Sequence, residues 1–95
     1  MLSLYYKPSC PYCLRVLTAN ETIKADVSLL DISVDESVRA ELIVRGGKQQ
    51  VPYLEDATRG VSMYESIDII EYLAQYYGSG VVPETNVPGN VCPID

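Results

Sequence analysis

The beginning of the chain changes from a strand-like to a helix-like pattern of hydrophobic positions. In residues 2–6, leucine or tyrosine recurs at every second position, which is the period of a strand. Pro11 suits the first turn of a helix, where a missing N–H group breaks no hydrogen bond. We therefore predict a strand over residues 2–6 and a helix from Pro11 into the low twenties, with Leu14, Val16 and Leu17 directed inward.

The middle of the chain contains three further strand patterns and a second helix pattern. Residues 27–32 are mainly apolar and predict a strand. Residues 36–45 carry apolar side chains at helical spacing, and the following Gly46-Gly47 ends a helix with residues that tolerate positive φ. Residues 51–54 and 61–63 flank a turn-forming loop, so they predict an antiparallel hairpin.

The predicted helix over residues 66–77 has the clearest amphipathic pattern of the chain. Its inward stripe is predicted to consist of Ile67, Ile70, Leu73, Ala74 and Tyr77. The order βαβαββα predicts an α/β fold with a four-stranded mixed sheet flanked by helices, in which the first two strands are parallel through a right-handed crossover. Residues 79–95 hold three of the six prolines and no hydrophobic period. We therefore predict one domain over residues 1–78 and an extended or mobile tail over residues 79–95 without a further element.

The composition narrows the classes of protein to which the chain can belong. Its 95 residues, 47% of them hydrophobic, suffice for one globular domain. Thirteen acidic and seven basic residues give a net charge of −6, which disfavours nucleic acid as a partner. The absence of histidine excludes Cys–His and Ser–His catalysis and every histidine-containing metal site. The N-terminus does not resemble a secretory signal, no apolar run approaches the ~20 residues of a spanning helix, and three cysteines do not make a disulfide scaffold. We therefore expect a cytoplasmic protein without membrane contact, and we also expect a monomer.

Cys10-Pro11-Tyr12-Cys13 carries the strongest chemical signal in the sequence. Two intervening residues on the first turn of a helix bring two sulfurs within bonding distance, as in redox-active cysteine pairs. We expect Cys10 to be exposed near the helix cap and Cys13 to lie beneath it. Unpaired N–H groups at the helix start would stabilise the Cys10 thiolate, with Lys7 as the nearest cation. No metal site is expected, because Cys92 would supply only a third zinc ligand.

A stabilised thiolate at Cys10 would act mainly as a leaving group. Lowering a thiol pKa from ~8.5 to ~5 raises the thiolate fraction at neutral pH about thirtyfold, but the loss of nucleophilicity is of similar size. The remaining effect is an easier expulsion of Cys10 from a mixed disulfide. The sequence therefore favours an enzyme whose adduct is resolved by an external thiol.

The stretch Lys7-Pro8-Ser9-Cys10-Pro11-Tyr12-Cys13 resembles the active-site sequence of dithiol glutaredoxins. Val51-Pro52 stands where that family has a cis-proline, and Glu65-Ser66 resembles the start of its glutathione-site helix. This last stretch is closer to the glutathione-transferase-like branch of the family. The resemblance covers about residues 2–77, and it implies a thioredoxin-like fold and a glutathione-dependent thiol–disulfide oxidoreductase.

The resemblance also implies a role for each matching residue. Cys10 would be the nucleophile, and Cys13 the thiol that resolves protein disulfides. The implied glutathione site consists of Lys7, Tyr12, Gln50, Val51, Pro52, Glu65 and Ser66. Within it, Lys7 would pair with the glycine carboxylate, and the backbone of Val51 would pair with the cysteinyl unit. No bound cofactor is implied; glutathione would be the reducing co-substrate, and disulfide-containing or glutathionylated proteins would be the partners.

Two other functions remain open at this stage. One is a carrier of a [2Fe–2S] cluster held by Cys10 of two protomers and two glutathiones, which Pro11 disfavours because cluster binders of the family mostly have a smaller residue there. The other is a glutathione-binding, transferase-like module without redox activity, although that branch normally continues into a helical second domain. Cys92 has no counterpart in the family; we interpret it as an incidental tail thiol, with a regulatory or intermolecular disulfide as the alternative.

Overall fold

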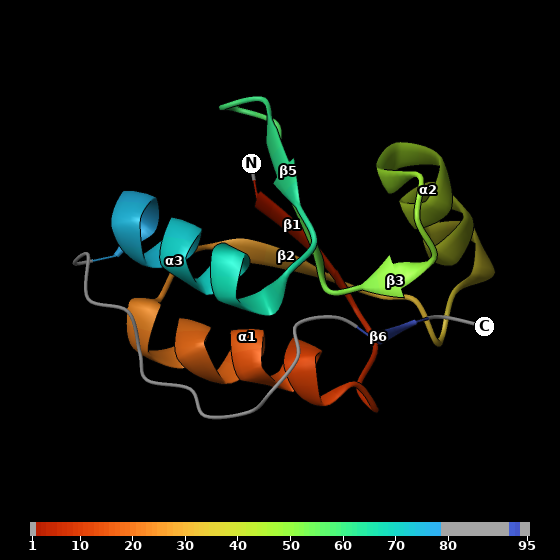
Figure 1. Ribbon diagram of the computed structural model, residues 1–95, viewed down its shortest axis with the longest axis horizontal. Helices are drawn as coiled ribbons and strands as arrows, with labels where there is room; N and C mark the ends of the chain where they lie inside the picture. The colour runs from red at the N-terminus through yellow and green to blue at the C-terminus, as the bar shows by residue number, and fades with distance from the viewer. Residues whose placement is uncertain (1, 79–91, 94–95) are drawn as a thin grey trace.

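The computed structural model describes residues 2–78 and 92–93, and these form three helices and six strands (Figure 1). In chain order the elements are β1 (Leu2–Tyr6), α1 (Pro11–Ile23), β2 (Val27–Asp31), α2 (Glu36–Gly46), β3 (Gln50–Val51), β4 (Tyr53–Asp56), β5 (Val61–Met63), α3 (Ser66–Tyr77) and β6 (Cys92–Pro93). The described helices include none that is long and apolar enough to cross a membrane.

Four of the strands form one mixed sheet in the order β2-β1-β4-β5. β1 is parallel to β2 and antiparallel to β4, and β4 forms a hairpin with β5. Both neighbours of β1 pair with Leu4, which lies opposite Leu29 and Leu54. The predicted mixed sheet, its parallel first pair and its hairpin are confirmed.

The predicted strand over residues 51–54 is divided in two at Pro52. The Val51–Pro52 peptide bond is cis, as the resemblance implied, and β3 ends before this proline while β4 begins after it. β3 pairs with β6 in a separate two-stranded antiparallel sheet. β6 corrects the prediction of a tail without a further element; two residues, one of them a proline, carry no measurable period. The other residues of the predicted tail, 79–91 and 94–95, lie outside the described part of the chain.

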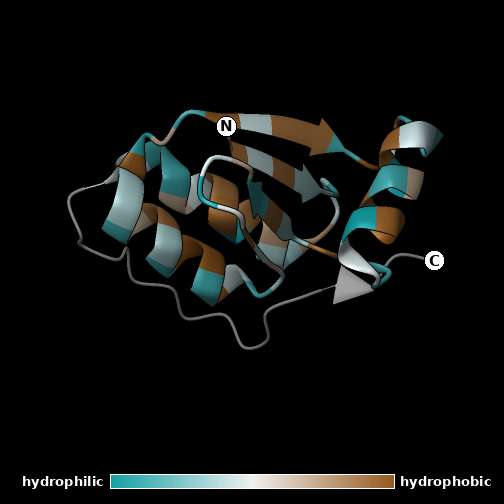
Figure 2. Cartoon of the chain, turned by 90° about the horizontal axis from the view of Figure 1, so that it is seen from above, coloured by the Kyte–Doolittle hydropathy of each residue, from teal (hydrophilic) through white to brown (hydrophobic). Residues whose placement is uncertain are grey.

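The two faces of the sheet bury different clusters of side chains. Leu2 and Leu4 point toward α1 and α3, which lie side by side on one face (Figure 1). Tyr5 points to the opposite face, where it joins Leu42 of α2. Successive side chains of β1 point to opposite faces of the sheet, so this strand contributes to both clusters. Figure 2 accordingly shows the sheet strands as largely hydrophobic and the helices as mixed.

The predicted inward faces of the helices need three corrections. Leu14, Ile67 and Tyr77 were predicted to point inward, but they are 46%, 39% and 37% exposed. In α3, Ile69 and Tyr72 are buried instead, together with the correctly predicted Ile70, Leu73 and Ala74. The buried face is therefore rotated relative to the predicted stripe. In this orientation the Tyr72 hydroxyl forms a hydrogen bond with a buried acidic side chain. The hydrophobic pattern does not predict this contact, because it ignores polar groups.

That partner is Asp56, a carboxylate at the end of β4 with no exposed surface. The Tyr72 hydroxyl donates a hydrogen bond to Asp56 Oδ2 at 2.5 Å, and the Tyr77 hydroxyl donates to the same oxygen. The Arg59 backbone N–H donates to Asp56 Oδ1 at 3.3 Å. The carboxylate thus ties the end of β4 to the C-terminal half of α3, and its charge is met by three donors.

Gly46, the last residue of α2, lies against Tyr64 and provides a test of this packing. A Cβ atom at position 46 would lie 1.9 Å from Tyr64 Oη, which is hydrogen-bonded to the Lys48 backbone. We expect Gly46→Ala to lower the free energy of unfolding by about 1–3 kcal/mol, as overpacking does. Chemical denaturation measures this change, and adding Tyr64→Phe should restore part of it. A stabilised Gly46→Ala variant, as helix propensity alone predicts, would contradict this packing.

Candidate functional site

The predicted redox motif lies at the start of α1, as expected. Cys10 is the N-cap residue with extended backbone angles (φ −91°, ψ 116°), and Pro11 is the first helical residue. The Cys10 backbone N–H donates to the Lys7 carbonyl at 2.9 Å, and the Cys10 carbonyl accepts from the Leu14 N–H at 3.1 Å. The turn from Lys7 to Cys10 therefore leads directly into the helix. It sets residue 10 beside the first N–H groups of α1, which have no partners within the helix.

Cys10, Cys13 and Val51 belong to one buried cluster, and Tyr12 packs against it. Pro52, joined to Val51 by the cis bond, is also fully buried. The fold thus brings together five residues that the sequence placed at the site, from segments about forty positions apart. Gln50 is half-buried beside Val51 on β3.

The burial of Cys10 corrects a sequence-based prediction. We expected an exposed Cys10 above a buried Cys13, but both have an exposed fraction of 0%. Cys10 packs in the same buried cluster as Ile32, Leu42 and Val51, which come from three other parts of the chain. Cys13 is a free thiol, so the two cysteines of the motif are not bonded to each other.

Burial has a clear effect on the acidity of Cys13. It raises the pKa of this thiol to about 11, although a hydrogen bond to the Lys7 backbone and the charge of Lys7 act in the opposite direction. Cys13 is therefore a neutral thiol near neutral pH, since only a small fraction can ionise there.

This protonation state predicts slow alkylation of Cys13. In a Cys10→Ser/Cys92→Ser variant, where Cys13 is the remaining cysteine, we expect iodoacetamide to react at pH 8 about a hundredfold more slowly in the folded than in the urea-unfolded chain, whose thiol pKa is ~8.5. The folded-state rate should rise about tenfold per pH unit, as the thiolate fraction does. Mass spectrometry of quenched samples measures both rates. Equal rates in the folded and unfolded chains would show that Cys13 is neither buried nor neutral.

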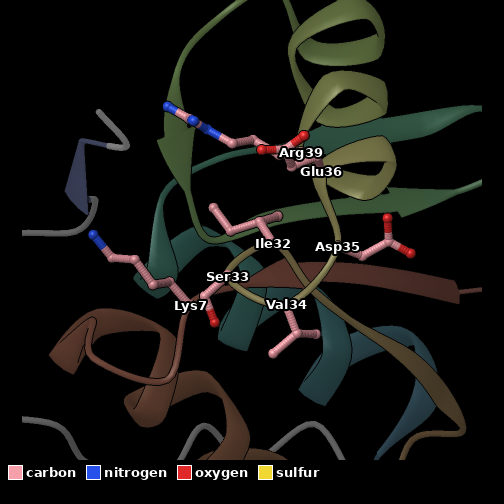
Figure 3. Close-up of a pocket in the computed structure, with 7 residues that line it drawn as sticks. All are labelled: Lys7, Ile32, Ser33, Val34, Asp35, Glu36 and Arg39. Carbon is pink, nitrogen blue, oxygen red and sulfur yellow. The ribbon is translucent and has the colours of Figure 1, made fainter.

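Lys7 lines a pocket of about 320 Å³ next to the motif. Its other lining residues are Ile32, Ser33, Val34, Asp35, Glu36 and Arg39. Figure 3 shows the Lys7 ammonium and the Arg39 guanidinium extending to the same side, while the Asp35 carboxylate points away from them. Two cations on one side suit a ligand carboxylate. The sequence predicted Lys7 but missed Arg39, because only the crossover from β2 to α2 brings this arginine near the motif.

The two remaining predicted residues lie at the start of α3. Glu65 is the N-cap residue and is exposed, and Ser66 is buried. A hydrogen bond and the negative charge of Asp68 raise the Glu65 pKa. Neither Glu65 nor Ser66 lines the pocket beside Lys7, so the structure does not group them with Lys7. Among residues 2–78 and 92–93, no group of three or more cysteine, aspartate or glutamate residues could hold a metal ion.

The chain is similar in sequence and structure to glutathione transferases. The sequence matches the family described as "Glutathione S-transferase, N-terminal domain" over residues 4–84. No curated protein matches it significantly. A delta-class glutathione transferase of Nilaparvata lugens superposes with a TM-score of 0.69 and 31% sequence identity, over 82% of this chain and 37% of that one. The chain thus spans little more than a third of that transferase.

Two plant glutaredoxins also have similar structures. A buckwheat glutaredoxin solved as a complex with glutathione gives a TM-score of 0.58 at 21% identity, over 73% of this chain and 63% of that chain. A wheat glutaredoxin gives 0.59 at 17% identity, over 83% and 73%. These likenesses, together with the mixed sheet and its flanking helices, confirm the thioredoxin-like fold. They do not separate the dithiol glutaredoxin type from the transferase type.

Proposed function

Because the chain belongs to the glutathione S-transferase N-terminal domain family, we propose that it binds glutathione and works as a glutathione-dependent thiol–disulfide oxidoreductase. The observation that carries this proposal is the position of Cys10. It caps α1 and packs with Cys13 and Val51, next to the cis Val51–Pro52 bond. A sulfur at this place can be stabilised as a thiolate by the N–H groups of the first helical turn.

The proposed reaction exchanges disulfides without any other oxidant or reductant. The Cys10 thiolate attacks the glutathione sulfur of a glutathionylated protein, so the protein thiolate leaves and Cys10 carries glutathione. A glutathione thiolate then attacks the glutathione sulfur of this adduct. Glutathione disulfide forms, and Cys10 leaves as the thiolate that the helix start stabilises. In sum, one glutathionylated protein and one free glutathione give the protein thiol and one glutathione disulfide, whose other half comes from the substrate.

Glutathione binding would use the elements around the motif. The backbone of Val51 would pair with the cysteinyl unit in place of β6, with Gln50 and Tyr12 beside it. Lys7, aided by Arg39, would hold the glycine carboxylate, since their cationic groups extend to one side of the same pocket (Figure 3). Glu65 and Ser66, at the N-terminus of α3, would meet the γ-glutamyl end.

Cys13 would take part only when the substrate is a protein disulfide. After Cys10 attacks a protein disulfide, Cys13 would attack the Cys10 sulfur and release the second protein thiol. That step requires a Cys13 thiolate, which burial disfavours by raising the Cys13 pKa to about 11. We therefore expect removal of glutathione from glutathionylated proteins to be faster than reduction of protein disulfides.

A turnover assay tests the proposal. The purified full chain is given glutathione and a glutathionylated peptide, and the formation of glutathione disulfide is followed. The family match also favours a second candidate, conjugation of glutathione to an electrophile, so the same preparation is assayed with 1-chloro-2,4-dinitrobenzene. Peptide reduction without conjugation supports the oxidoreductase. Conjugation without peptide reduction would replace it by the transferase-like module.

A further inference from the structure

The residue that lies opposite Val51 across the β3–β6 pair is a cysteine. β6 runs antiparallel to β3, with Cys92 opposite Val51 and Pro93 opposite Gln50. Figure 1 shows β6 beside β3, next to the turn that joins β1 to α1. Val51 is the residue whose backbone the proposed function assigns to the cysteinyl unit of glutathione. The backbone of Cys92 therefore takes the place, along this strand edge, of the cysteine in the substrate.

The states of the other two cysteines also indicate Cys92. The sequence contains three cysteines. Cys13 is a free thiol, whereas Cys10 is disulfide-bonded. Since Cys10 and Val51 share one buried cluster, a cysteine paired with Val51 has its backbone close to Cys10. The remaining cysteine of the sequence is Cys92.

We propose that Cys92 is a second resolving cysteine, which displaces glutathione from Cys10 and closes a Cys10–Cys92 disulfide. The inference rests on the proposed function for the origin of the Cys10 adduct. The Cys10 thiolate first attacks glutathione disulfide, which releases one glutathione thiolate and leaves the other glutathione on Cys10. The Cys92 thiolate then attacks the Cys10 sulfur, which releases the second glutathione thiolate. In sum, one glutathione disulfide is reduced to two glutathiones, and two cysteine thiols become one disulfide.

The strand pair gives Cys92 two properties that Cys13 lacks. Backbone pairing with Val51 holds residue 92 as an extended segment at a substrate-binding edge, so its attack is intramolecular and oriented. Glutathione would need the same backbone groups of Val51, so the glutathione on Cys10 has to release Val51 before the segment pairs there and Cys92 attacks. The closed disulfide would thus protect Cys10 and block the site until glutathione reopens it.

Disulfide mapping of the full chain tests this proposal. The reduced protein is incubated with glutathione disulfide, quenched by alkylation and digested with trypsin without reduction. Trypsin does not cleave the Lys7-Pro8 bond, so Cys10 and Cys13 fall in the peptide of residues 1–15, and Cys92 falls in that of residues 60–95. We expect the two peptides to be linked in the wild type and in Cys13→Ser, and the link to be lost in Cys10→Ser.

The outcomes separate this inference from the proposed function. An internal Cys10–Cys13 disulfide as the main product, or a link that persists in Cys10→Ser, would overturn the role of Cys92 even if the turnover assay succeeds. A Cys10–Cys92 link in a chain that fails the turnover assay would leave the role of Cys92 intact and remove the oxidoreductase. Adding excess glutathione to the linked protein should reopen the disulfide and release both peptides.

Discussion

Replacing Cys10 by serine is expected to reduce glutathione-dependent turnover by more than about a thousandfold, because a serine hydroxyl neither ionises near neutral pH nor forms a mixed disulfide. The loss should appear in kcat/KM for the glutathionylated peptide. Serine keeps the N-cap position and is itself a favourable N-cap residue, so the fold should persist. Circular dichroism of the variant checks this point.

Cys13→Ser is the matched control for this experiment. It changes the other cysteine of the motif by the same single atom, and it leaves Cys10 at the cap of α1. Because glutathione can resolve the Cys10 adduct from solution, Cys13→Ser should retain most of the activity on the glutathionylated peptide. Equal losses in the two variants would show that the motif acts as a structural unit, and full activity without Cys10 would end the proposed mechanism.

The largest effect on stability is expected from Asp56→Ala. This substitution removes the acceptor of the Tyr72 and Tyr77 hydroxyls in a place without exposed surface. Hydrogen bonds to a charged group are worth more than neutral ones, so the free energy of unfolding should fall by about 2–4 kcal/mol. Urea denaturation followed by tyrosine fluorescence measures the change. Glu55→Gln, on the neighbouring residue of β4, is the control and should change stability less, because the ion pair between Glu55 and Arg45 is partly exposed to solvent.

The same carboxylate predicts how stability depends on pH. Burial alone would raise the Asp56 pKa, but the hydrogen bonds from Tyr72 and Tyr77 outweigh it, and the pKa is lowered overall. A carboxyl group with a lower pKa in the folded than in the unfolded chain stabilises the fold above its unfolded pKa of ~3.9. This contribution disappears as the pH falls through the folded pKa. The wild type should therefore lose more stability than Asp56→Ala between pH 5 and pH 2, and parallel losses would contradict this role.

Local signals in the sequence were sufficient for most elements. Alternation defined β1, the proline at the first helical position defined the start of α1, and turn residues defined the β4–β5 hairpin. The rotated face of α3 could not be predicted, because its position depends on Asp56 in β4. Hydrophobic periodicity placed Tyr77 in the inward stripe and left Tyr72 out, whereas in the structure Tyr72 is buried against the Asp56 carboxylate and Tyr77 reaches the same carboxylate from a partly exposed position.

The candidate site was predictable to the extent that its residues are close in sequence or match a family motif. Cys10, Cys13 and Val51 were identified and do pack together. The burial of Cys10 and the pairing of Cys92 with Val51 were missed, because both depend on contacts between distant segments. Arg39 was missed for the same reason. The hydrophobic pattern of α2 does not show that the connection from β2 places Arg39 near Lys7.

The burial of Cys13 also determines which cysteine of the motif is oxidised when the protein is exposed to peroxide. Oxidation to sulfenic and then sulfinic acid proceeds from an accessible thiolate. Cys13 has no exposed surface, and its thiol remains protonated well above neutral pH. Irreversible damage would therefore fall on Cys10 whenever that sulfur is reduced and uncovered, while its neighbour one helical turn away stays intact.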